Sequence, residues 1–122
     1  MEERSNKLRE ILDDLDATVP AIEAVAVVSI EGLPIESKLP PNIDETRVAA
    51  MTAAMLSLGE RASLEVGRGE LERIFVESKD GVIILMDAGP NAVLFVSAKK
   101  NVKLGLIFLD MKRAASHIAE FL

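Results

Sequence analysis

The sequence contains no cysteine, no tryptophan and no tyrosine, and four of its 122 residues are phenylalanine. Without cysteine the chain can form neither a disulfide nor a thiolate nucleophile, and most structural zinc sites are excluded because they use thiolate ligands. The absence of cysteine also fits a reducing compartment. Aromatic side chains line many ligand pockets and stack on the bases of single-stranded nucleic acids. Their scarcity therefore counts against both kinds of site.

The chain also lacks an excess of positive charge and a long apolar run. It has 14 Lys and Arg against 20 Asp and Glu, which makes the net charge −6. An acidic surface repels phosphate backbones and anionic lipid headgroups, so we expect no nucleic-acid partner. The N-terminal residues MEERSNKLRE are too charged for an export signal, and no apolar segment reaches the roughly 20 residues that cross a bilayer. We therefore expect a cytoplasmic protein with no membrane-inserted segment.

What is present fits one globular domain, which we place at residues 1–122, because 49% of the residues are hydrophobic. Apolar residues three and four positions apart predict amphipathic helices over residues 3–19 and from about residue 101 to the end. A longer helix is predicted from Asp44, a suitable N-cap, to about Val66, where Gly67 ends it. Short β-branched runs between Gly and Pro turns predict five strands, at residues 24–30, 34–38, 70–78, 82–88 and 92–98.

The predicted order of elements is α-β-β-α-β-β-β-α. Three of the strands, at residues 24–30, 82–88 and 92–98, are apolar on both alternating faces, so helices must cover both sides of the sheet. We predict an α/β sandwich around a five-stranded, mostly antiparallel sheet. The two one-sided helices share one face, and the long middle helix lies alone on the other.

The middle helix has two apolar faces. At about 100° per residue its bulky side chains form one stripe that we expect to face the sheet: Val48, Met51, Met55, Leu58, Ala62 and Val66. The opposite side is small along its middle and carries Thr46, Ala50, Ala53, Ala54, Ser57, Arg61 and Leu64. Alanine is the best helix former and tolerates exposure, so this side can simply be solvated. Alternatively, its small side chains let a second helix approach closely, as in a two-fold homodimer.

The strand at residues 70–78 supports the dimer. It opens the meander and can therefore lie at an edge of the sheet. Its central residues Ile74, Phe75 and Val76 offer neither a charge nor a proline to block pairing with another strand. We predict that this strand and the outer side of the middle helix together form a dimer or partner interface.

Three stretches carry a resemblance to a known family: SIEGLPIES on the first hairpin, the run from LERIFVES to KRAASHI through the meander, and NVKLGL before the last helix. With the order of elements over nearly the whole chain, they resemble the Roadblock family of dynein light chain relatives, which has MglB-like prokaryotic and archaeal members. The resemblance implies a dimer with paired middle helices and a sheet continued through the third strand. It also implies a platform for Ras-like small GTPases, as activator, localiser or scaffold, or an adaptor in motor complexes.

The residues themselves predict no catalytic, cofactor-binding or metal-binding site. His117 has no second His and no Cys nearby, so we place it on the surface or at its rim. The loop at residues 67–69 follows a helix, whereas a phosphate-binding loop precedes one, and it lacks the Gly-Lys-Ser or Gly-Lys-Thr signature. Arg68, between two glycines, could be offered to a GTPase as an arginine finger. A solvated loop residue is the alternative.

Together these patterns predict a non-enzymatic, homodimeric interaction module that binds and regulates or scaffolds a Ras-like small GTPase. A paralogous Roadblock subunit is a further partner to consider. The alternative is a structural adaptor subunit of a motor or filament assembly, with no dependence on nucleotide state. A small-ligand sensor would need an apolar pocket with converging polar groups, of which the sequence shows no trace.

Overall fold

The computed structural model describes residues 2–122 and confirms the predicted order of elements. These elements are α1 (Glu2–Thr18), β1 (Ile22–Ser29), β2 (Pro34–Lys38), α2 (Glu45–Glu65), β3 (Arg73–Ser78), β4 (Gly81–Asp87), β5 (Ala92–Ala98) and α3 (Leu104–Glu120). Two elements, β3 and α3, start later than predicted. Residues 67–72 lead the chain from the end of α2 back to the sheet, and a turn in which Val102 N–H donates to the Lys99 carbonyl precedes α3.

The five strands form one sheet in the order β2-β1-β5-β4-β3, and all its pairings are antiparallel. Val25 in the middle of the sheet pairs with Lys38 of β2 on one side and with Val96 of β5 on the other. β3 is an edge strand, as expected, and pairs with β4 from Arg73 opposite Met86 to Ser78 opposite Gly81. Its other edge is open in the described part of the chain.

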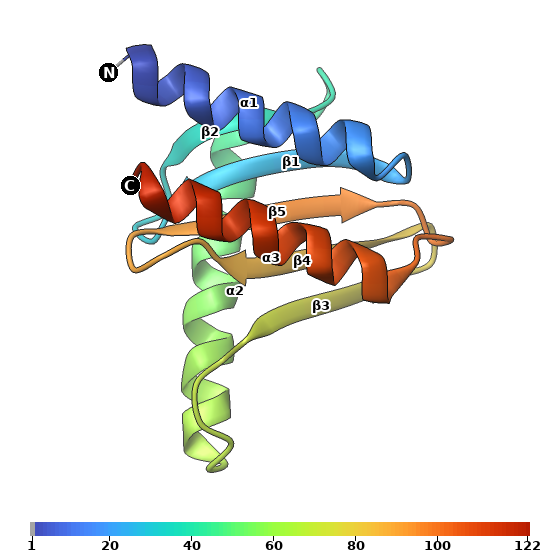
Figure 1. Ribbon diagram of the computed structural model, residues 1–122. Coiled ribbons are helices and arrows are strands. Elements are labelled where there is room, and N and C mark those ends of the chain that lie inside the picture. Colours follow the sequence, from blue (N-terminus) through green and yellow to red (C-terminus); the bar gives the residue numbers. More distant parts are fainter. Residues whose placement is uncertain (1) are drawn as a thin grey trace.

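Helices cover both faces of the sheet, as the strands that are apolar on both sides require. In Figure 1, α1 and α3 lie side by side on one face, and α2 crosses the other. Val25 and Val27 of β1 belong to the core under α1 and α3, while Ala26 and Val28 belong to the core under α2. The strand's alternation thus divides one apolar run between two cores.

Both ends of α2 form as the sequence predicts. Asp44 is the N-cap, and its side chain accepts hydrogen bonds from the backbone N–H groups of Thr46 at 2.9 Å and Arg47 at 3.3 Å. At the other end Gly67 has φ of +70°, and its N–H donates to the Leu64 carbonyl. Arg68 N–H donates to the Ser63 carbonyl. These two bonds make a Schellman motif, so the loop after α2 is tied to the helix.

Candidate interaction surface on α2 and β3

Helix α2 is longer than the sheet beneath it is wide. It crosses the strands, and its C-terminal turns project past β3 (Figure 1). Its first half buries Val48, Ala49, Thr52 and Leu56 against the sheet. Beyond Gly59 it runs out of strands to cover, and Leu64 and Val66 are 64% and 68% exposed. The sheet therefore ends before the helix does.

The predicted sheet-facing stripe of α2 is partly wrong. Val48 and Met55 pack towards the sheet, but Met51, Leu58, Ala62 and Val66 are exposed. The bulk of the side chains alone could not predict which apolar side of α2 faces the sheet. The core under α2 contains small residues of β1, Ala24 and Ala26, and the small residues Ala49 and Thr52 of α2 are buried there. Val66 lies on the same side as Val48, because 18 residues make five turns, yet the sheet no longer extends beneath it.

The predicted outer side of α2 is for the most part free. Thr46, Ala50, Ala54, Ser57, Arg61 and Leu64 are exposed. Ala53 is half-buried because the β1–β2 turn packs on it: a Cβ on Gly32 would lie 3.5 Å from the Ala53 Cβ. Met51 and Leu58 were predicted to face the sheet. Instead they add two large apolar side chains to this outer side, and are 56% and 63% exposed. The absence of charged residues from both sides of this part of the helix was the sequence feature that could have indicated that these two side chains are exposed.

The edge strand β3 divides its side chains between the two faces of the sheet. Ile74 packs towards α2, so closely that a Cβ on Gly59 would lie 2.7 Å from the Ile74 Cδ1. Phe75 faces the other way, and its ring meets Phe108 of α3 edge-on at a centroid distance of 6.4 Å. Val76 is half-buried. The side chains of these predicted interface residues thus lie on the two faces of the sheet, with Phe75 still 39% exposed, and the backbone edge is the part of β3 open to another strand.

We call the exposed outer side of α2, its projecting C-terminal turn and the open edge of β3 together the α2–β3 surface. On α2 it consists of Ala50, Met51, Ala54, Ser57, Leu58, Arg61, Leu64 and Val66. Large exposed apolar side chains that gather on one element mark a surface for another macromolecule. This surface offers apolar packing to another macromolecule, with small residues along its middle and bulky ones beside them.

The remaining predicted residues lie apart from one another. His117 is exposed on α3, which confirms its place on the surface. Arg68 is exposed between two glycines of positive φ. Over residues 2–122, no three His, Asp or Glu side chains gather as metal ligands would. Nor does any helix in that range have the length and apolarity to cross a membrane.

Comparison with known proteins identifies the family. The model of the Roadblock/LC7 domain matches residues 8–98, from α1 to the end of β5. The chain belongs to the Roadblock/LC7 family. This confirms the resemblance seen in the sequence, and members of the family are typically non-catalytic interaction modules.

Individual relatives and solved structures are similar to the chain over most of its length. The chain is 39% identical over 108 residues to the uncharacterized protein MJ0310 of Methanocaldococcus jannaschii, covering 88% of this chain and 93% of that protein. Myxococcus xanthus MglB is 26% identical with a TM-score of 0.86, and 93% of each chain is covered. A structure described as MglB with tetrameric arrangement has a TM-score of 0.88 at 17% identity, covering 97% of this chain and 89% of that one. These likenesses confirm the fold.

Proposed function

We propose that this protein is a non-enzymatic, homodimeric interaction module that binds a Ras-like small GTPase and regulates or scaffolds it. The observation that carries the proposal is the projection of α2 past the edge strand β3. In a two-fold dimer paired through β3, the sheet of the second copy would lie beneath the projecting turns. Val66, on the sheet side of α2, would then be covered by that sheet, and Leu64, on the outer side, by the second copy's α2. By symmetry the same two residues of the second copy would be covered.

Burial gives this arrangement a favourable free energy. Covering a Val, Leu or Met side chain contributes roughly 1.5–3 kcal/mol. The α2–β3 surface holds four that are more than half exposed in the single chain: Met51, Leu58, Leu64 and Val66. Ala50, Ala54 and Ser57 between them would let two helices approach closely. The open edge of β3 would gain backbone hydrogen bonds to its own copy.

The GTPase part of the proposal is supported by family membership and by the likeness to Myxococcus xanthus MglB. The Roadblock resemblance implies platforms for Ras-like GTPases, and a dimer would offer such a partner a broad, rigid face. A paralogous Roadblock chain could replace one copy, because the same projecting helix and open edge would serve a mixed pair.

Self-association is tested by Leu64→Glu. We expect the wild-type chain to sediment as a dimer and the variant as a folded monomer, because the substitution puts a carboxylate where the second copy's α2 would pack. Leu106→Glu is the matched control: Leu106 is 58% exposed on α3, away from the α2–β3 surface, and its variant should remain dimeric. A wild-type monomer at all concentrations would refute the dimer, and a dimeric Leu64→Glu would refute an interface that includes the projecting end of α2.

GTPase binding is tested by calorimetric titration with the small GTPases of the same cell, each loaded with GDP and with a GTP analogue. We expect one GTPase to bind, with affinities that differ between the two nucleotide states. Binding to neither state would favour the alternative, a structural adaptor of a motor or filament assembly.

The action of Arg68 as an arginine finger on a bound GTPase is a separate prediction within this function. It is exposed, and the Schellman motif holds its backbone, so it could be presented in a defined position. If it acts on the bound nucleotide, Arg68→Ala should abolish any stimulation of GTP hydrolysis and leave GTPase binding intact. Stimulation at the wild-type rate would exclude that role and leave Arg68 a loop residue.

A further inference from the structure

The face of the sheet that carries α1 and α3 has an uncovered strand. α1 packs on β1 and β2, and α3 packs on β4 and β5. Packed helices lie about 10 Å apart and strands about 4.8 Å apart, so two helices cover about four strands. The fifth strand, β3, leaves Arg73 and Phe75 exposed beside α3. This strip is on the opposite side of the sheet from α2.

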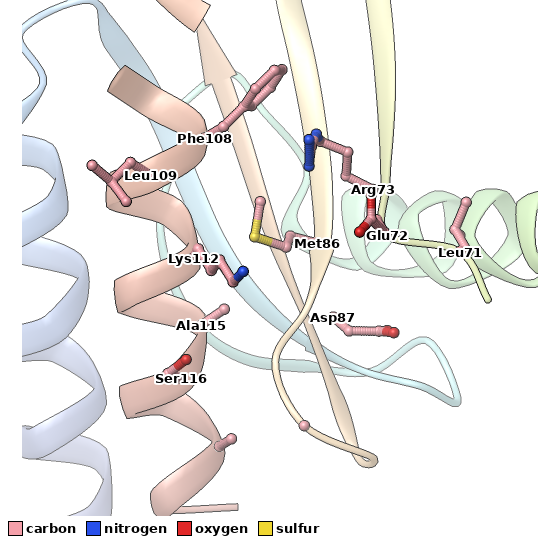
Figure 2. A pocket seen from close by; sticks show the side chains of 12 residues that line it. Leu71, Glu72, Arg73, Met86, Asp87, Phe108, Leu109, Lys112, Ala115 and Ser116 are labelled. Atoms are coloured by element: carbon pink, nitrogen blue, oxygen red, sulfur yellow. The ribbon is translucent and has the colours of Figure 1, made fainter. Parts of the chain in front are cut away.

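A groove of about 520 Å³ runs between α3 and the β3–β4 hairpin. Met86 of β4 and Phe108 of α3 give it apolar walls, and Ala115 lies further along α3 (Figure 2). Ala119, one helical turn after Ala115, also lines the groove. At the Ala119 end of the groove the chain's own β4–β5 turn packs closely on α3: a Cβ on Gly89 would be 2.9 Å from the Ala119 Cβ. The groove thus presents apolar side chains beside α3 that no helix of the described chain covers.

Two cations face this groove. The Arg73 guanidinium lies over the Phe108 ring, 4.4 Å from its centroid, and Lys112 follows Phe108 by one helical turn. Figure 2 shows both side chains pointing into the space between α3 and β3. Neither forms an ion pair with any side chain of residues 2–122. The position of Arg73 over the ring face leaves guanidinium N–H donors available to a carboxylate.

The groove also has two acidic residues, neither of them on α3, and Glu72 lies beside Arg73 at the β3 wall (Figure 2). Glu72 is on the approach to β3, and Asp87 points away from α3 in Figure 2. Asp87 belongs to the α2 side of β4, where burial and the charges of Glu60 and Glu70 raise the pKa of its carboxyl. The part of the groove next to α3 is therefore positive, in a chain whose net charge is −6.

We infer that this groove binds an amphipathic helix of a partner protein, whose apolar side chains cover Met86 and Phe108 and whose Asp or Glu carboxylates pair with Arg73 and Lys112. The inference goes beyond the proposed function, because it uses the face of the sheet opposite α2 and a wall, α3, that lies outside the residues matched by the Roadblock/LC7 model. Charge complementarity selects an acidic helix over a basic one.

The test uses three synthetic amphipathic helical peptides with one apolar face in common and a polar face that is acidic, neutral (Asn and Gln) or basic. We expect the wild-type protein to bind the acidic peptide in a fluorescence anisotropy titration. The double variant Arg73→Glu/Lys112→Glu should bind it at least about tenfold more weakly and bind the basic peptide instead. Lys112→Glu alone, at an exposed helix position, should show a smaller change in the same directions.

The matched control is Lys99→Glu/Lys103→Glu, the same change of charge in the exposed loop before α3. It should bind the acidic peptide like the wild type. No saturable binding of the acidic peptide at about 1 mM, or equal weakening in the control, would overturn the inference. The dimer is tested separately: Leu64→Glu should keep peptide binding, and the groove variants should keep the oligomeric state of the wild type.

Discussion

Thr52 has a buried hydroxyl without a partner. Its side chain is fully buried between α2 and the sheet, and its Oγ1 forms no hydrogen bond within residues 2–122. Leaving a hydroxyl unpaired in an apolar environment costs about 1–3 kcal/mol, and valine has the same shape without the hydroxyl. We predict that Thr52→Val raises the free energy of unfolding by about 1 kcal/mol, measured by urea denaturation. Thr46→Val, at an exposed position of α2, should change it by less than about 0.5 kcal/mol. A destabilised Thr52→Val would show that the hydroxyl has a partner.

Asp87 makes stability depend on pH. Burial, and then the charges of Glu60 and Glu70, raise the pKa of its carboxyl above 3.8. The folded state therefore binds this proton more tightly than the unfolded state does. This contribution to stability is complete below the unfolded pKa and is lost as pH rises through the folded pKa. We predict that Asp87→Asn raises the thermal midpoint relative to wild type at pH 7 but not at pH 3. The gain should stay below about 1 kcal/mol, because solvent screens a half-exposed group. An equal effect at both pH values would contradict this origin.

At the scale of the element, α2 depends on its N-cap. The Asp44 carboxylate accepts from two backbone N–H groups that have no partner inside the helix. We predict that Asp44→Ala lowers the free energy of unfolding by about 1 kcal/mol in urea denaturation. Asp44→Ser, which can still cap, should lose a few tenths of that, and an undiminished stability of Asp44→Ala would mean that tertiary packing alone sets the start of α2.

The elements themselves were largely readable in the sequence. Caps, Gly and Pro turns and apolar periodicity depend on neighbours a few residues away, so they predicted all eight elements and the N-cap and end of α2. These local patterns did not predict which side of α2 faces the sheet. Met51 and Leu58 are as bulky as inward residues, yet they point outward. The small residues Ala49 and Thr52 are buried instead, in the core that contains small residues of β1.

At the scale of the whole molecule, the proposed dimer couples folding to association. If the folded chain is dimeric, mass action makes its thermal midpoint rise with protein concentration. We predict that tenfold dilution lowers the midpoint of the wild type and of Leu106→Glu, measured by differential scanning calorimetry. Leu64→Glu should show no such dependence. A concentration-independent midpoint in the wild type would argue that the projecting end of α2 is uncovered in solution.

The sequence by itself determined the order of the eight elements, the two-sided covering of the sheet and the Roadblock resemblance, because each rests on local patterns or on motifs continuous in the chain. The tertiary structure decided which side of α2 is free, where α2 runs past β3, and that Arg73 meets Phe108 and Lys112 at one groove. Those facts depend on strand order and on contacts between elements far apart in the chain. An apolar or charged residue can satisfy its local pattern equally well before such a neighbour is known.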